Sequence, residues 1–247
     1  MKVVALIPAR YASTRFPQKP LAAILGKPMI LWVAELTAKA VGIENTYVAT
    51  DHEAIASVVQ DSGFRTVMTS PNALTGTDRI AEAAELIEAD FFINVQGDEP
   101  MLDPASIRTV IQHAKSHADE VINGFAPIGD SEDPNNVNLP KCVIASDMRL
   151  LYMSRAAVPA FKDPSKMPTA YYKQVCIYSF TKAHLSAYAR AGVKAPCEKS
   201  EDIEILRFLD LGFKVRMVEL PGDTLAVDVP ADIELVEFAM QKRGRAK

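Results

Sequence analysis

Cysteine is scarce in this chain of 247 residues, which contains only three. Cys142, Cys176 and Cys197 lie far apart in the sequence and form no CxxC pair. Closely spaced cysteines are what a zinc knuckle or a disulfide-rich scaffold requires. The sequence therefore argues against both and predicts three reduced, packed thiols.

Long apolar runs are missing too. No stretch reaches about 18 uninterrupted apolar residues, the length that a membrane-spanning helix needs. The first apolar segment is short and ends in Pro8-Ala9-Arg10, without the apolar core and cleavage site of a signal peptide. We therefore expect no membrane partner and a cytoplasmic location.

The chain has no excess of positive charge. It carries 27 Lys and Arg residues against 31 Asp and Glu, which gives a formal net charge of −4. Proteins that bind nucleic acid through its phosphates carry a basic excess. The composition argues against a nucleic-acid partner, and an anionic small ligand would have to be met by a local group of cations.

The common nucleotide and nucleophile motifs are absent as well. The sequence contains no GxxxxGK[ST] of a P-loop, no GxGxxG of a Rossmann turn and no GxSxG of a hydrolase. Any nucleotide site must therefore use a different loop.

Alternation of strands and helices is the main pattern that is present. Short β-branched or apolar segments predict strands, and apolar residues at helical spacing predict helices. The predicted strands are 2–8, 45–51, 65–70, 91–96, 141–146, 150–158, 171–180 and 214–220, and the predicted helices begin at 29 and 104 or span 52–62, 77–88, 181–190, 200–211 and 231–242.

This order predicts an α/β fold with a doubly wound, mostly parallel sheet. Ligands of such sheets bind at the carboxyl ends of the strands. We expect a single domain over 1–247, with a strand-rich, Pro-interrupted insert or flap at about 130–190.

Three polar segments follow predicted strands. The first runs from Arg10 through Arg15 to Lys19 and combines three cations with two hydroxyl side chains, which suits a polyphosphate. It could also be a solvated basic loop.

The second segment is Gln96-Gly97-Asp98-Glu99, in which a carboxylate leaves a buried strand. Magnesium needs few carboxylates, because waters and substrate phosphates complete its shell. Asp98 is therefore a candidate ligand, with Asp228 as the second. The alternative is that Asp98 caps a turn and Asp228 caps the last helix.

The third segment is Thr75-Gly76-Thr77-Asp78-Arg79, a turn that opens a helix, and Thr50 ends another strand. Free N–H groups at a helix start attract anions or a base carbonyl. An ordinary capping turn would look the same.

Taken in order, these segments strongly resemble the 3-deoxy-manno-octulosonate (Kdo) cytidylyltransferases over nearly the whole chain. The blocks that carry the resemblance are IPARYASTRFPQKPL, LGKPMI, YVATD, MTS, TGTDR, INVQGDEP, LYMSRAAVP and AVDVPADIE. The resemblance implies a nucleotidyltransferase fold, a homodimer that the insert helps to form, and the use of Mg²⁺ and CTP to make CMP-Kdo and pyrophosphate for lipopolysaccharide.

The resemblance also implies roles for particular residues. The CTP-binding set is Arg10, Ser13, Arg15, Lys19, Thr50, Thr75, Gly76, Thr77 and Asp98. The sugar-acid set is Arg79, Gln96, Arg155, Gln174, Tyr178 and Glu204, with Arg155 as the partner of the substrate carboxylate. The metal ligands are Asp98 and Asp228, which with Arg10 and Lys19 form the catalytic set.

Two blocks depart from the family pattern. His-Leu-Gly-Ile-Tyr is replaced by Gln174-Val-Cys176-Ile-Tyr178, and Leu-Glu-Gln-Leu-Arg by Ile203-Glu-Ile205-Leu-Arg207. Both lie where the sugar acid is expected, so a related acceptor such as 8-amino-Kdo is an alternative. Two further alternatives are a non-catalytic nucleotide-binding module and a glycosyltransferase, although the latter would favour Asp-x-Asp over Gly97-Asp98-Glu99.

Overall fold

Seven strands form the main path of a nine-stranded sheet in the middle of the computed structural model, which describes residues 1–13, 16–129, 132–222 and 224–245. The strands lie in the order β11-β7-β10-β6-β1-β4-β5. Their bounds are β1 Val3–Ala9, β4 Thr46–Thr50, β5 Arg65–Met68, β6 Phe91–Val95, β7 Val121–Pro127, β10 Tyr172–Phe180 and β11 Val215–Glu219. Only β10 runs against its neighbours β6 and β7, while the other pairs along the path are parallel. The predicted mostly parallel α/β sheet is confirmed.

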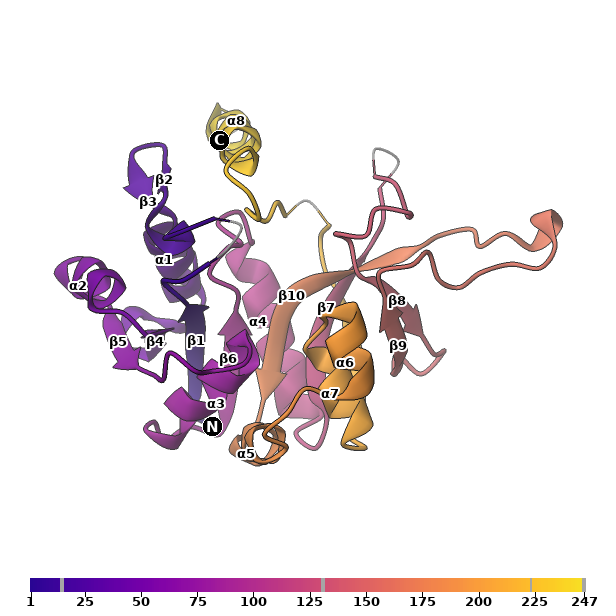
Figure 1. Cartoon of the computed structure of the whole chain (residues 1–247), viewed down its shortest axis with the longest axis horizontal. Helices are drawn as coiled ribbons and strands as arrows, with labels where there is room; N and C mark the ends of the chain where they lie inside the picture. Colours follow the sequence, from indigo (N-terminus) through magenta and orange to yellow (C-terminus); the bar gives the residue numbers. More distant parts are fainter. Residues whose placement is uncertain (14–15, 130–131, 223, 246–247) are drawn as a thin grey trace.

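Helices cover both faces of this sheet (Figure 1). One face is covered by α1 (Met29–Val41), α2 (Glu53–Asp61) and α4 (Pro104–Ser116). The other is covered by α3 (Gly76–Glu85), α5 (Lys182–Arg190) and α7 (Ile205–Asp210), with the short α6 (Pro196–Glu201) beside α7. Strand β1 alternates between the two apolar cores, with Ile7 on one side and Leu6 on the other, which is why its sequence reads as a continuous apolar run.

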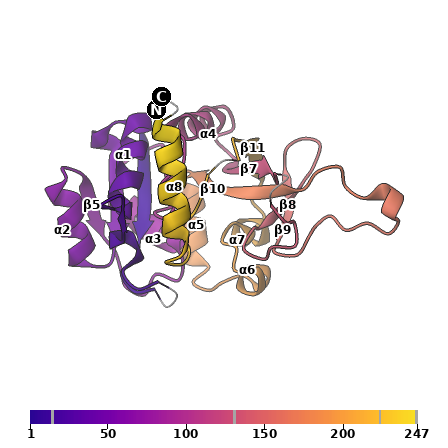
Figure 2. The ribbon, with the colours of Figure 1, turned by 90° about the horizontal axis from the view of Figure 1, so that it is seen from above.

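The last helix, α8 (Asp232–Arg245), lies across one end of the molecule (Figure 2). Val236 on its inner side packs with Ile24 and Met29, next to the two-stranded ribbon of β2 (Ala23–Ile24) and β3 (Lys27–Pro28). The helix therefore packs against the ribbon that follows the loop after β1. Three short 3₁₀ turns, at Lys19–Leu21, Ile43–Asn45 and Pro164–Lys166, complete the elements of the described residues.

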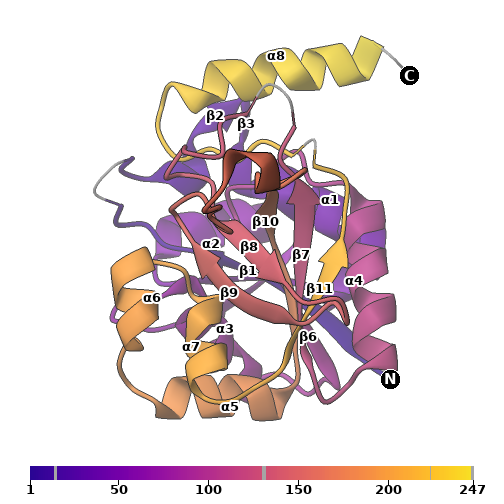
Figure 3. The ribbon, with the colours of Figure 1, turned by 90° about the vertical axis from the view of Figure 1, so that its right-hand side faces the viewer.

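The insert is narrower than the range 130–190. The hairpin of β8 (Lys141–Ile144) and β9 (Leu150–Ser154) joins the sheet through the pair Lys141 and Lys173 and through a bridge between Arg149 and Arg216 (Figure 3). The segment 155–171 projects away from the body (Figures 1 and 2). The expected upper boundary is wrong, because β10 lies between β6 and β7 and α5 packs on the sheet.

Two other predictions of local structure need correction. The helix expected at 200–211 is broken into α6 and α7, because Asp202 adopts a left-handed backbone conformation with φ of 51°. Strand β7 was not predicted. The capping prediction for α4 is confirmed: the Asp103 side chain accepts a hydrogen bond from the Ala105 N–H, and Pro104 occupies the first turn.

Candidate active site

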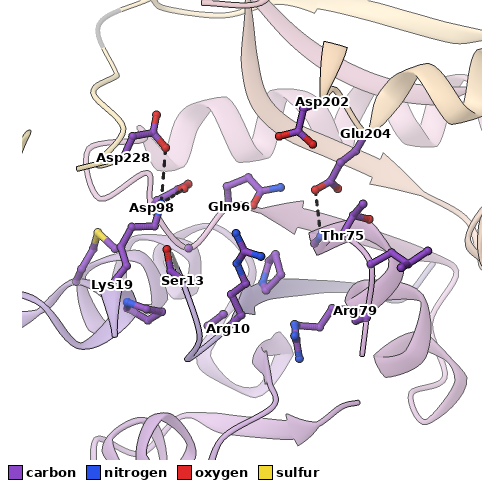
Figure 4. Close-up of a pocket in the computed structure, with 18 of the residues that line it drawn as sticks. Arg10, Ser13, Lys19, Thr75, Arg79, Gln96, Asp98, Asp202, Glu204 and Asp228 are labelled. Carbon is purple, nitrogen blue, oxygen red and sulfur yellow. Dashed lines mark hydrogen bonds and ion pairs between the residues drawn. The ribbon is translucent and has the colours of Figure 1, made fainter. Parts of the chain in front are cut away.

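A cavity of about 260 Å³ opens where β1 and β6 end (Figure 4). Its walls come from the loop after β1, the turn after β6, the start of α3, the loops on either side of α6 and the segment before α8. This is the edge of a parallel sheet at which ligands bind. Ten of the residues predicted for the site line the cavity: Arg10, Ser13, Lys19, Thr75, Gly76, Arg79, Gln96, Asp98, Glu204 and Asp228.

The basic loop after β1 reaches the cavity as predicted. The exposed side chain of Arg10 makes no hydrogen bond or ion pair with the part of the chain that the structure describes, so its donors face the cavity unused. The loop itself is held in place, because the Tyr11 N–H donates to Asp51 Oδ1 at 3.0 Å and the Tyr11 ring stacks on His52 at 3.6 Å. Arg15, predicted to bind CTP, lies outside the described residues.

Two carboxylates meet Lys19 beside this loop. Lys19 Nζ lies 2.6 Å from Asp98 Oδ2 and 3.8 Å from Asp228 Oδ1, and it donates to the Val227 carbonyl at 2.9 Å. The Val227 N–H in turn donates to the Asp98 carbonyl at 3.0 Å, which ties the turn after β6 to the segment before α8. The two predicted metal ligands, far apart in sequence, are thus brought to one place.

The turn that carries Asp98 depends on a glycine. A Cβ atom on Gly97 would come within 2.8 Å of the Pro8 carbonyl oxygen, so no larger residue fits while the ends of β1 and β6 stay this close. The Asp98 carboxylate is held at the cavity for this reason.

The donor set suits a magnesium ion. An ammonium group already stands between the two carboxylates, which shows that the place between Asp98 and Asp228 accepts a cation. No cluster of three or more His, Cys, Asp or Glu side chains that could hold a metal occurs among the described residues. A pair of carboxylates is what Mg²⁺ uses when waters and substrate phosphates supply its other ligands.

The carboxylate of Glu204, which directly precedes α7, caps the first turn of α3. This carboxylate accepts hydrogen bonds from the Gly76 N–H at 3.0 Å, the Thr77 N–H at 2.8 Å and the Thr77 hydroxyl at 2.5 Å. Burial raises the pKa of Glu204, while these hydrogen bonds oppose that shift. The N–H groups that we expected to face a ligand are therefore already bonded, and Thr75 and Gly76 offer the cavity their remaining surface.

A buried arginine, Arg207, stabilises the wall of the cavity that the start of α3 forms. Arg207 donates to Asp78 at 2.9 and 3.2 Å and to Glu198 at 2.7 and 2.6 Å, and its guanidinium lies 3.8 Å from the centre of the Tyr188 ring. Asp78 also accepts a hydrogen bond from the Thr75 hydroxyl at 2.7 Å. Arg207 thus connects α7 with α3, α5 and α6.

Arg79 and Gln96, which we expected in the sugar-acid set, both line the cavity. The Arg79 guanidinium donates to Asp51 Oδ2 at 3.1 Å and to the Thr69 hydroxyl at 2.5 Å, so it is fixed by the chain itself. Gln96 follows β6 directly and presents its amide to the cavity (Figure 4).

Five other predicted residues do not line the cavity. Thr50 and Thr77 are buried. The Gln174 amide donates to Asn123 Oδ1 at 3.0 Å and to the Tyr178 hydroxyl at 3.1 Å, and burial raises the pKa of Tyr178. The Arg155 guanidinium donates to the backbone carbonyls of Val137, Glu201 and Asp202 instead of facing the cavity.

Three residues at or beside the site were missed. Lys194 and Asp202 line the cavity and form an ion pair at 2.8 Å. No sequence signal marks them, since they follow no strand. Glu99 is buried beside Asp98, and burial together with the Asp98 charge raises its pKa to about 7. Its place directly after Asp98 was the one available signal.

Comparison with known proteins assigns the chain to a family. The family model described as cytidylyltransferase matches residues 4–215. An 8-amino-3,8-dideoxy-manno-octulosonate cytidylyltransferase of Shewanella frigidimarina is 40% identical, with 97% of this chain and 99% of the relative covered. A 3-deoxy-manno-octulosonate cytidylyltransferase of Geobacter metallireducens is 41% identical, with 96% of each chain covered.

A solved structure shares the whole architecture. CMP:2-keto-3-deoxy-manno-octonic acid synthetase complexed with CTP superimposes with a TM-score of 0.90 at 34% identity, covering 98% of this chain and 100% of that one. No helix among the described residues is both long and apolar enough to span a membrane. With the family model covering most of the sequence and these relatives matching nearly all of it, the chain belongs to the cytidylyltransferases, enzymes that transfer CMP.

Proposed function

We propose that the protein transfers CMP from CTP to the anomeric 2-hydroxyl of Kdo in a Mg²⁺-dependent reaction that releases pyrophosphate, as a step in lipopolysaccharide synthesis. One observation carries the proposal. Two carboxylates, Asp98 and Asp228, and two cations, Arg10 and Lys19, share one cavity at the carboxyl ends of the strands. The similarity to relatives with this named activity extends over nearly the whole chain.

The reaction is an in-line displacement at the α-phosphorus. The sugar oxygen forms a bond to the α-phosphorus and gives its proton to water. The bond between the α-phosphorus and the oxygen that bridges to the β-phosphate breaks, and pyrophosphate leaves. Arg10 and Lys19 neutralise the charge that grows on the leaving group, and the wall formed by Thr75 and Gly76 holds the nucleoside. Asp98 and Asp228 would hold Mg²⁺, which would polarise the α-phosphate and lower the pKa of the attacking hydroxyl.

The sugar acid binds on the side of the cavity formed by Gln96, Arg79 and Glu204, with Lys194 nearby. Lys194 is a candidate partner for the substrate carboxylate. Arg155 can take that role only if its guanidinium leaves the backbone carbonyls to which it now donates.

The second candidate acceptor is 8-amino-Kdo, because relatives with either activity are about equally similar to this chain. The substitutions at Gln174 and Cys176 fall on β10, where Gln174 is bonded to the Tyr178 hydroxyl. A site that hydrogen-bonds one substituent rejects an analogue strongly. If the polarity at this position decides between the two acids, Gln174→His shifts the kcat/KM ratio toward Kdo, and an unchanged ratio discards that role.

A homodimer and a cytoplasmic location complete the proposal. The segment 155–171 projects from the body (Figure 1), and its apolar side chains Phe161 and Met167 are exposed, which suits contact with a second copy. The mass in solution, measured by light scattering, tests the dimer. The cytoplasm is where CTP is supplied.

The test of the function is pyrophosphate release with Mg²⁺ and each of four nucleoside triphosphates, using Kdo and 8-amino-Kdo as acceptors. Release with CTP and Kdo supports the proposal, and release with 8-amino-Kdo alone moves the acceptor to the second candidate. Binding of CTP without release on either acid would support the non-catalytic module instead. A glycosyltransferase would release no pyrophosphate.

A further inference from the structure

The ammonium group of Lys19 is anchored entirely on the acidic side of the cavity. Its partners are the Asp98 carboxylate at 2.6 Å, the Val227 carbonyl at 2.9 Å and the Asp228 carboxylate at 3.8 Å (Figure 4). The side chains of Lys19 and Asp98 are only 19% and 27% exposed, so water screens this pair poorly. Lys19 therefore serves as the counter-ion of the two carboxylates.

The other cation of the same cavity behaves differently. Arg10 makes no hydrogen bond or ion pair within the described part of the chain, although it lines the same space. Arg10 is ready to receive an anion, whereas Lys19 must first release the carboxylates. Of the two cations of the predicted triphosphate site, Lys19 is thus paired with carboxylates and Arg10 is not.

We infer that the Lys19 ammonium takes the place of the divalent cation in the nucleotide-free protein, so that metal and Lys19 compete for Asp98 and Asp228. The metal then enters together with the triphosphate, whose oxygens draw Lys19 away from the carboxylates. The inference rests on the proposed function, because it takes the metal ligands from it.

Simple geometry supports the competition. A magnesium ion bonds its oxygen ligands at about 2.1 Å, and Lys19 Nζ already lies 2.6 Å from Oδ2 of the Asp98 carboxylate. An ammonium and a dication on one carboxylate repel each other strongly in a half-buried place. A triphosphate adds several negative charges next to Arg10. The Lys19 ammonium and the metal ion can then both bind phosphate oxygens. Without nucleotide, the Lys19 ammonium therefore already occupies the position that the metal needs. Binding of the nucleotide frees that position.

The experiment measures metal binding and needs no turnover. Mn²⁺ is titrated into nucleotide-free protein, and the unbound ion is followed by electron paramagnetic resonance. We expect Lys19→Met to bind Mn²⁺ at least fivefold more tightly than the wild type, because the competing ammonium is gone. Lys27→Met is the matched control, since Lys27 pairs with Glu35 outside the cavity, and it should leave Mn²⁺ affinity unchanged.

A second substitution assigns any gain to the site. In Lys19→Met combined with Asp98→Asn the gain should disappear, and circular dichroism confirms that each variant is folded. A gain below fivefold in Lys19→Met, or a gain that persists in the double variant, would overturn the inference.

Parallel titrations with CTP separate this inference from the proposed function. If the wild type retains Mn²⁺ and CTP together on ultrafiltration while Lys19→Met shows no gain without CTP, only the competition is refuted. If no form of the protein retains Mn²⁺ with or without CTP, the metal ligands themselves are wrong and both fall.

Discussion

Replacing Arg207 with methionine should destabilise the protein severely. The guanidinium is 1% exposed and neutralises Asp78 and Glu198, of which Glu198 is fully buried. Methionine fills a similar volume but leaves both carboxylates without their cation. Removing one member of a buried ion pair costs about 3–5 kcal/mol, because the remaining charge stays in a medium of low polarity.

That loss is a large part of the total, since proteins unfold with a free energy of about 5–15 kcal/mol. With a urea dependence near 3 kcal/mol per molar, the unfolding midpoint should fall by about 1–2 M, followed by circular dichroism at pH 7. Arg207→Lys, which keeps the charge but loses the paired donors, should lie between methionine and the wild type.

Arg149→Met is the matched control. Arg149 is 50% exposed and its contact with Asp147 is 3.8 Å long, so its loss should cost less than about 1 kcal/mol. A value for Arg207→Met within about 1 kcal/mol of the wild type would refute the view that the buried network stabilises the wall of the cavity.

Three further predictions concern the turn after β6. Asp98→Asn should lower kcat for pyrophosphate release by about 10² to 10³ with an unchanged circular dichroism spectrum, and an active variant would remove Asp98 from the site. Gly97→Ala should lower the free energy of unfolding by about 1–3 kcal/mol, because its Cβ would lie 2.8 Å from the Pro8 carbonyl, whereas Gly244→Ala, with open space around it, should not lower it. In EDTA, stability should fall as the pH rises from about 4.5 to about 7, because the raised pKa of Glu99 makes the folded state bind more protons than the unfolded state there. Glu99→Gln should remove up to about 3 kcal/mol of that total loss of stability, and an unchanged loss in urea titrations across this pH range would contradict the burial effect.

The sequence predicted those parts of the fold that depend on neighbouring residues. The alternation of apolar segments placed most strands and helices, and Asp103 with Pro104 marked the start of α4 because a cap is a local interaction. Polar residues directly after β1 and β6 indicated the cavity, since strand ends of a parallel sheet share one edge.

The rest depended on partners far away in the sequence. Strand β7 was missed because Asn123 and Gly124 interrupt its apolar run. The Asn123 amide is satisfied by the carbonyls of Val175 and Ile177, at an irregularity of β10 that lies about fifty residues later. No local sequence pattern predicts a hydrogen bond between residues this far apart.

The same limit applies to the site. Apolar spacing continues through Ile203 and Leu206, so it hid the break at Asp202 that turns Glu204 toward the start of α3. The sequence also did not show which way the Arg155 guanidinium points, because the backbone carbonyls that it binds belong to two other segments.

The position of β10 has a consequence for the order in which the protein can be assembled. Strand β7 leaves the ribosome well before β10, yet the two strands with which it pairs in the described part of the chain, β10 and β11, are both made later. During synthesis, β5, β4, β1 and β6 can pair as soon as they emerge, while β7 must wait with an apolar face uncovered. Nascent chains that stop between β7 and β10 are therefore the stage at which we expect chaperone binding and aggregation to be greatest.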